Sequence, residues 1–362
     1  MIQALLYMTL GLCGLYILFT LLLMTGLFRL AKHNNTAQPF VTVVIAARNE
    51  AVNIKSCLQA LKLQSYPSQK IEIILVNDRS TDRTIEQAQN CTLPNLTIIS
   101  VTHQDHLCPK KNALHQGIMA SQGEIILTTD ADCAPEPYWI QNTIQCFTPP
   151  IGMIVGYAPL LAPPGLFNPL LGVPSLVVAA LSAGSIGLGF PLTCSGRNLA
   201  YRRKAYDDVH GFEGVGHILG GDDVYLMNKI AKSAYHIAFH HSPNAKVPSS
   251  VHTDNQLNRQ VRYQSKSLHY DTNALLPALA VYIFHLILFL LPLWFLYFPS
   301  AFYTVGLCLV LKSTADMAVL TVAAKRFGSL QQFIWFPILE AILVPYVVIF
   351  CALGALMPTK WK

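Results

Sequence analysis

The sequence predicts an α/β domain with a mostly parallel sheet, set between apolar segments long enough to cross a membrane. Hydrophobic residues make up 52% of the 362 residues and charged residues only 12%, which is about half the charged share of soluble domains. Residues 38–271 are more polar, and short runs rich in Val and Ile alternate there with segments of helical spacing. Such runs are typical of parallel strands covered by helices on both faces.

The apolar segments lie at both ends of the chain. Residues 1–30 carry no charged side chain before Arg29, which suffices for a helix of about 20 residues to cross a bilayer. Because Arg29 and Lys32 follow this run, we expect a retained anchor with the domain at 38–271 in the cytoplasm. Residues 273–358 predict three more transmembrane helices, and between the last two Lys325 and Arg326 fit a cytoplasmic loop; the three spans are 275–298, 301–323 and 333–356.

Polar residues follow three of the predicted strands. "VTVVIAARNE" ends in Glu50, "IEIILVNDRSTD" contains Asp78, and "EIILTTDAD" contains Asp130 and Asp132. The carboxyl ends of parallel strands form the ligand-binding edge of an open sheet, so we expect these side chains to share one site. Helix capping, for example by Asp82, is the alternative explanation for each group taken alone.

The pair Asp130 and Asp132 predicts a metal site. Residues i and i+2 of a strand face the same way, and two adjacent carboxylates are unfavourable without a cation between them. Hard oxygen ligands select Mg²⁺ or Mn²⁺, usually together with substrate phosphates. The first strand lacks a following G-x-G-x-x-G, and no G-x-x-x-x-G-K-[ST] occurs anywhere, which argues against dehydrogenases and P-loop enzymes.

The motifs together resemble a known enzyme family. "VTVVIAARNE", "ILVNDRSTDRT", "PKKNALHQGIMASQGEIILTTDAD", "CSGRNLAYRRKAYDDVHGF", "GGDDVYL" and "RQVRYQSK" occur in that order. Over residues 40–270 this is similar to the family 2 glycosyltransferases of the GT-A (Rossmann-like) fold, nearest in pattern to membrane-bound ceramide and hopanoid glucosyltransferases. The resemblance implies a UDP- or GDP-linked sugar donor.

The resemblance also implies roles for individual residues. Asp78 would bind the nucleotide base, with Glu50 near the nucleoside and Lys110 by the phosphates. Asp130 would contact ribose or sugar and share the metal with its ligand Asp132. Three further positions follow from the later motifs: Asn198 near the sugar, Asp222 in the acidic pair, and Asp223 as the general base.

"RQVRYQSK" places Arg259 and Arg262 on one face of a helix, where they could hold a diphosphate. The related families read Q-x-x-R-W or R-x-x-R-W here, so Tyr263 replaces the tryptophan. Arg259 in place of glutamine favours a single-transfer enzyme. A basic helix lying on anionic lipid is an alternative that is compatible with this role.

Several other features have simpler explanations. The apolar segment 165–192 is broken by Pro and Gly, and we expect it to be interfacial, because one more crossing would separate Asp223 from Asp132. His240 and His241 are expected on the surface or in loops. Lys312 and Asp316 are four residues apart and are expected to neutralise each other or to mark a path for a polar lipid head, whereas Glu340 has no partner by sequence.

The leading hypothesis is an inverting, metal-dependent hexosyltransferase of glycolipid biosynthesis that transfers a sugar to a lipid or lipid-linked hydroxyl. We expect it in a bacterial inner membrane with a cytoplasmic catalytic domain and no nucleic-acid partner. Two alternatives are a processive polysaccharide synthase, disfavoured by the few C-terminal spans, and a scaffold or transporter with a degenerate sugar-binding domain. Intact acidic positions argue against the second.

Overall fold

The computed structural model describes residues 2–101, 106–161, 172–250, 261, 272–330 and 335–357. The chain divides into two compact units. One contains residues 25–251 and 323–329, and the other contains residues 1–24, 252–322 and 330–362. We refer to them as the sheet unit and the helical unit.

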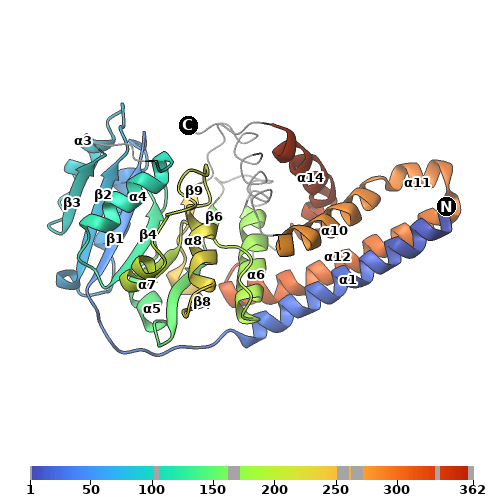
Figure 1. Cartoon of the computed structure of the whole chain (residues 1–362), viewed down its shortest axis with the longest axis horizontal. Coiled ribbons are helices and arrows are strands. Elements are labelled where there is room, and N and C mark those ends of the chain that lie inside the picture. Colours follow the sequence, from blue (N-terminus) through green and yellow to red (C-terminus); the bar gives the residue numbers. More distant parts are fainter. Residues whose placement is uncertain are drawn as a thin grey trace. The chain divides into compact units, whose positions relative to one another are not determined.

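A seven-stranded sheet forms the centre of the sheet unit (Figure 1). Its spatial order is β3-β2-β1-β4-β7-β5-β8, and all neighbours are parallel except β7, which runs antiparallel to β4 and β5. The predicted parallel α/β sheet is therefore confirmed, with one reversed strand. The strands are β1 (Val41–Ala47), β2 (Ile71–Asn77), β3 (Leu96–Ser100), β4 (Ile125–Asp130), β5 (Ile151–Gly156), β7 (Leu199–Arg202) and β8 (His236–His240).

Helices cover the sheet because their apolar residues recur at helical spacing. In α2 (Ile54–Lys62) the buried residues are Ile54, Cys57, Leu58 and Leu61, which form one face of the helix. Helix α4 packs on β1 and β2 (Figure 1). Its Gly117 is needed there, because an added Cβ would lie 2.5 Å from Val44. The sheet unit also contains the helices α3 (Thr84–Gln89), α4 (Pro109–Ala120), α5 (Trp139–Gln145), α7 (Arg203–Asp208) and α8 (Asp222–Ala231).

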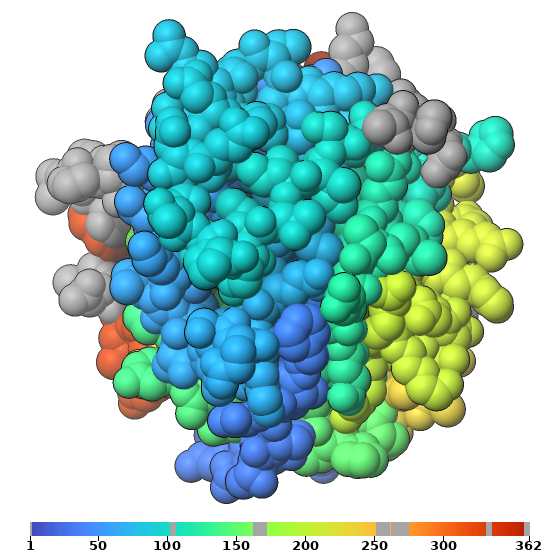
Figure 2. Space-filling model, turned by 90° about the vertical axis from the view of Figure 1, so that its left-hand side faces the viewer, coloured from blue at the N-terminus to red at the C-terminus, as the bar shows by residue number. Residues whose placement is uncertain are grey.

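The remaining elements of the sheet unit are short. Two 3-10 turns, η1 (Ser68–Lys70) and η3 (Pro243–Ala245), precede β2 and follow β8, and a small second sheet pairs β6 (Leu160–Leu161) with β9 (Ser249–Ser250). Figure 2 shows a face of this unit on which green segments lie between the blue and cyan segments of its first part and the yellow segments of its last part.

Helix α6 (Val173–Gly187) belongs to the sheet unit and packs against the end of α1 (Ile2–Arg29). An added Cβ at Gly26 would lie 1.8 Å from the Gly184 carbonyl oxygen, and one at Gly187 would lie 2.0 Å from that of Gly26. The helix has 15 residues, which is too short to span a bilayer. Residues 165–171 lie outside the described part, and an interfacial position of segment 165–192 stays a prediction.

The helical unit contains α10 (Thr272–Phe289), α11 (Leu291–Tyr297), most of α12 (Pro299–Phe327) and α14 (Phe336–Leu356), together with the first part of α1. Helices α1, α12 and α14 are long and apolar enough to cross a membrane, and α10 with α11 makes a fourth candidate bent by 49°. These correspond to the predicted segments.

Charged side chains link the helices of this unit. Lys312 is fully buried and forms salt bridges with Asp316, at 2.9 Å, and with Glu340. The Tyr16 hydroxyl of α1 donates to Asp316 at 2.8 Å. Lys312 and Asp316 do pair as predicted, and Glu340, which had no partner in the sequence, is the second anion of the same lysine.

Candidate functional site

The candidate site lies where strand β4 ends, at Asp130, and helix α8 begins, at Asp222. The Lys110 ammonium, on the first turn of α4, lies 2.8 Å from an Asp130 oxygen and 3.2 Å from an Asp222 oxygen. It thereby joins two acids that are distant in sequence. The sequence placed Lys110, Asp130 and Asp222 in one site, and the structure brings all three into direct contact.

Asp223 is fixed beside this cluster by backbone donors. Its Oδ2 accepts the Gly196 N–H at 2.9 Å, and its Oδ1 accepts its neighbour's N–H, from Val224, at 2.9 Å. Gly221 precedes α8 with φ +66°, a conformation that glycine adopts without a steric penalty. This turn directs both acids toward the loop before β7, where an added Cβ at Gly196 would lie 3.3 Å from Asp222 Oδ2.

The charges in the cluster stabilise one another. Burial disfavours the charged form of Lys110 and lowers its pKa. The negative charges of Asp130 and Asp222 have a larger effect and hold the pKa of Lys110 well above its usual range. Burial likewise opposes ionisation of Asp130, yet Lys110 and then Arg197 lower the pKa of that carboxyl. Asp130 is therefore anionic and Lys110 cationic at neutral pH.

Arg197 is a member of the site that the sequence argument did not identify. It donates to the Ser249 hydroxyl at 2.6 Å and to that of Ser195 at 3.3 Å, and its charge acts on Asp130. A second cation beside the acids adds capacity to bind phosphate. The signal lay in the quoted segment "CSGRNLAYRR", where Arg197 directly precedes the predicted Asn198.

The predicted metal site contains two carboxylates, Asp130 and Asp132, and their binding of a divalent cation stays a prediction. Asp132 is half-buried and lies in the turn that follows Asp130. Strand β4 already ends at Asp130. Asp132 is therefore not part of the strand, and the side-chain alternation of a strand does not set the relative direction of the two carboxylates. Among the residues described, no group of three or more His, Cys, Asp or Glu side chains could hold a metal ion. Two carboxylates with substrate phosphates are the usual Mg²⁺ environment.

The loops after β1 and β2 are interlocked on the other half of the edge. The Asn49 side-chain oxygen accepts the Thr81 N–H at 2.8 Å, and the Ala51 N–H donates to Asp82 at 3.0 Å. Asp82 also accepts the N–H of Thr84, the first residue of α3, at 3.0 Å, although the N-cap position itself is Arg83 and has no side-chain cap bond. The acids of these loops therefore include a structural one, Asp82.

The two residues predicted to bind the nucleoside lie on these loops. Asp78 is 4% exposed and pairs with Arg79 at 2.9 Å, and Glu50 accepts the Asn53 amide at 2.8 Å. Arg79 has φ +56°, which is uncommon for a residue other than glycine. Their contact with a nucleoside stays a prediction.

Asn198 does not reach the site surface. It is 3% exposed, and its side chain accepts the Trp139 indole N–H at 2.9 Å and donates to the Tyr157 and Ala245 carbonyls at 2.9 and 3.2 Å. Every polar atom of this amide bonds within the core. Asn198 thus ties three segments together, and a position near the sugar stays a prediction.

Arg259 and Arg262 lie outside the described residues. His240, expected on the surface or in a loop, instead ends β8 and is buried, 6% exposed. Burial, and then the charge of His241, lower its pKa to about 4, so His240 is neutral at physiological pH.

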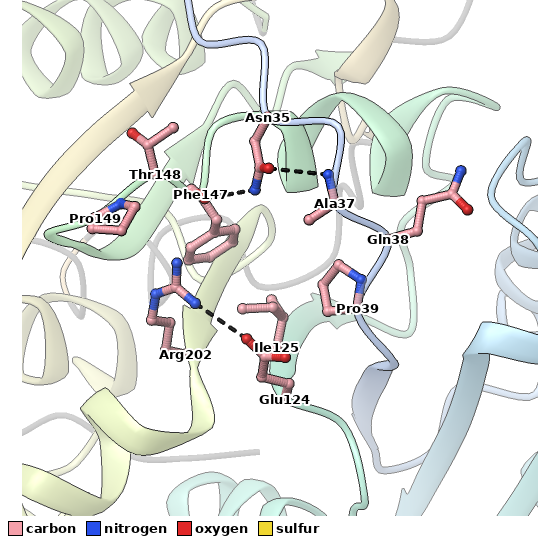
Figure 3. Close-up of a pocket in the computed structure, with 10 residues that line it drawn as sticks. All are labelled: Asn35, Ala37, Gln38, Pro39, Glu124, Ile125, Phe147, Thr148, Pro149 and Arg202. Carbon is pink, nitrogen blue, oxygen red and sulfur yellow. Dashed lines mark hydrogen bonds and ion pairs between the residues drawn. The ribbon is translucent and has the colours of Figure 1, made fainter.

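A pocket of about 410 Å³ lies at the opposite edge of the sheet (Figure 3). It adjoins the start of β4 at Ile125 and the end of antiparallel β7, where Arg202 pairs with Glu124 at 3.3 Å and its guanidinium lies 5.3 Å from the Phe147 ring centroid. None of the predicted site residues lines it. This cavity is therefore separate from the acidic cluster.

Comparison with known proteins agrees with this geometry. Residues 42–156 match the family described as glycosyl transferase family 2. The chain is 29% identical over 212 residues to glycosyltransferase AglE of Haloferax volcanii, covering 56% of this chain and 65% of the relative. It is 26% identical over 255 residues to the probable glycosyltransferase YdaM of Bacillus subtilis, covering 66% and 60%. The chain therefore spans less than two thirds of these relatives.

A shorter part of the chain is similar to a glycolipid synthase. A β-monoglucosyldiacylglycerol synthase of Nostoc is 34% identical over 113 residues, 30% of this chain and 24% of the relative. Among solved structures, the mannosyltransferase PcManGT from Pyrobaculum calidifontis, in complex with GDP-Man and Mn²⁺, superimposes with a TM-score of 0.58 at 21% identity, covering 98% of this chain and 100% of that one. This likeness shows the GT-A fold.

Proposed function

We propose that this chain, which carries a family 2 glycosyltransferase domain of the GT-A fold, moves a sugar from a nucleotide-diphosphate donor to a lipid hydroxyl with inversion. The observation that carries the proposal is the contact of Lys110 with both Asp130 and Asp222, with Asp223 fixed beside them. This arrangement places a cation that can bind a diphosphate next to a carboxylate that can act as a base.

Asp223 acts as the general base. Two backbone N–H groups set the direction of its carboxylate, so it can accept the proton of an acceptor hydroxyl as that oxygen attacks the anomeric carbon. Inversion requires the diphosphate to leave from the opposite face. The leaving side is therefore assigned to Lys110 and Arg197, whose charges stabilise the phosphates.

Asp130 and Asp132 would hold Mg²⁺ or Mn²⁺ together with the donor phosphates. A bound divalent cation neutralises the charge that develops on the leaving diphosphate. In the structure Lys110 lies against Asp130, and this contact supports the assignment because the carboxylate already pairs with a cation. PcManGT, whose fold this chain shares, is a GDP-Man and Mn²⁺ complex, and this supports a nucleotide-sugar donor.

The acceptor is proposed to be a lipid of the membrane in which the chain is anchored. Three helices long enough to span, or four with the bent pair, support a membrane location, and the similarity to a monoglucosyldiacylglycerol synthase supports a lipid acceptor. Basic residues at the ends of α1 and α12 favour a cytoplasmic sheet unit. A bacterial inner membrane is the corresponding compartment.

The test is transfer by the detergent-purified full chain, with a panel of nucleotide sugars, membrane lipid extract, and either Mg²⁺, Mn²⁺ or EDTA. We expect a glycolipid product that disappears with EDTA and in Asp132→Asn and Asp223→Asn. The matched control is Asp208→Asn, an acid of α7 outside the site. A product that survives both site variants, or a long polymer, would contradict the proposal.

A further inference from the structure

Three segments of the sheet unit carry basic charge without any acid. Residues 25–39, 239–250 and 323–329 contain no Asp or Glu, and all of them belong to this unit. They hold five cations that we name the cationic cluster: Arg29, Lys32, Lys246, Lys325 and Arg326. Two of these segments are the ends of α1 and α12.

The segments lie next to one another. The Arg326 guanidinium is 5.6 Å from the centroid of the Phe28 ring. The Lys246 ammonium lies 3.9 Å from the position that a Cβ on Gly328 would take. Besides burial, the charges of Arg326, Lys32 and His33 lower the pKa of His241, so these groups are also close to each other.

No carboxylate partner of the cationic cluster occurs among the residues that the structure describes. In the described part of the chain none of its five members forms an ion pair, whereas Arg79, Arg202, Arg203 and Lys204 of the same unit all do. Arg29, Lys32 and Lys325 are exposed. Several like charges held together without counter-ions are unfavourable unless an anion binds among them.

We propose that the cationic cluster binds the phosphate groups of anionic membrane lipids. Lipid is the source that the location favours, since Arg29 and Arg326 end two helices that are able to span a bilayer, and Phe28 beside them is 60% exposed, as aromatic residues at membrane interfaces often are. Basic residues next to a span attract the anionic headgroups of a leaflet. The inference does not depend on sugar transfer.

The test uses the full chain in phosphatidylcholine nanodiscs with increasing phosphatidylglycerol, and native mass spectrometry counts the lipids that stay bound. Wild type is expected to retain phosphatidylglycerol selectively and to lose it as salt rises. Each basic residue near an anionic surface contributes about fivefold to binding. The triple variant Lys32→Gln, Lys325→Gln, Arg326→Gln should therefore weaken apparent affinity by about a hundredfold.

Two controls keep the result specific. Lys55→Gln, Lys62→Gln, Lys232→Gln removes the same charge elsewhere on the sheet unit and should retain the lipid. Lys32→Arg, Lys325→Arg keeps the charge and should bind as wild type, which separates lost charge from lost folding. Equal retention by the first triple variant, equal loss in the control, or binding of free pyrophosphate without any lipid preference would overturn the proposal.

Discussion

Lys111 is expected to hold the loop that precedes the acidic pair, and Lys111→Met tests this. The side chain is 1% exposed, and its ammonium donates to the Val215 and Ile218 carbonyls, both at 2.7 Å. It also lies 5.1 Å from the Tyr225 ring centroid. The loop from 211 to 221 contains four glycines with positive φ, so it has little intrinsic order of its own.

The size of the effect follows from these contacts. A hydrogen bond to a charged group contributes roughly 1.5–3 kcal/mol, and methionine keeps the volume while removing both bonds. Part of this loss is offset because the buried charge disappears too. We expect the loop to open more easily by about 3 kcal/mol, which corresponds to roughly a hundredfold faster amide exchange.

Hydrogen exchange followed by mass spectrometry measures this directly. Peptides covering residues 212–221 should exchange faster in Lys111→Met, while peptides from β1 and β4 should be unchanged. Lys55→Met, on the exposed side of α2, is the matched control. Unchanged exchange in the loop, or an equal increase throughout the sheet, would refute the reasoning.

Three further predictions concern packing and charge. Gly26→Ala should destabilise the chain by about 1–3 kcal/mol because its Cβ would meet the Gly184 carbonyl. Gly14→Ala is the control and should not destabilise it, because no atom lies within 4 Å of the added Cβ. Thermal unfolding in detergent distinguishes the two variants. His240 is buried neutral with a pKa of about 4 against 6.5, so stability present above pH 6.5 should fall as pH drops toward 4, and His240→Gln should remove this slope in acid unfolding. Lys312→Met leaves Asp316 and Glu340 without their cation and should lower the free energy of unfolding by about 3–5 kcal/mol. Adding Glu340→Gln to this variant should restore part of the loss. Equal melting temperatures of the single and the double variant would contradict this.

The sequence alone determined the class of fold and predicted three residues, Lys110, Asp130 and Asp222, that the structure brings together. Short Val- and Ile-rich runs that alternate with segments of helical spacing indicate strands buried on both faces, and these are typical of parallel sheets. Because parallel strands share one carboxyl edge, Asp130 could be assigned to the ligand edge without coordinates. The long apolar segments identified the candidate spans by length alone.

Tertiary structure decided which polar groups are available. Asn198 and Asp130 both occur in quoted motifs, yet the first is consumed by core hydrogen bonds and the second faces Lys110. Lys111 and Lys110 are neighbours in sequence but point to different partners. Glu340 finds Lys312 on another helix. Such contacts join residues far apart in the chain, and local patterns carry no information about which distant group will satisfy a buried charge or amide.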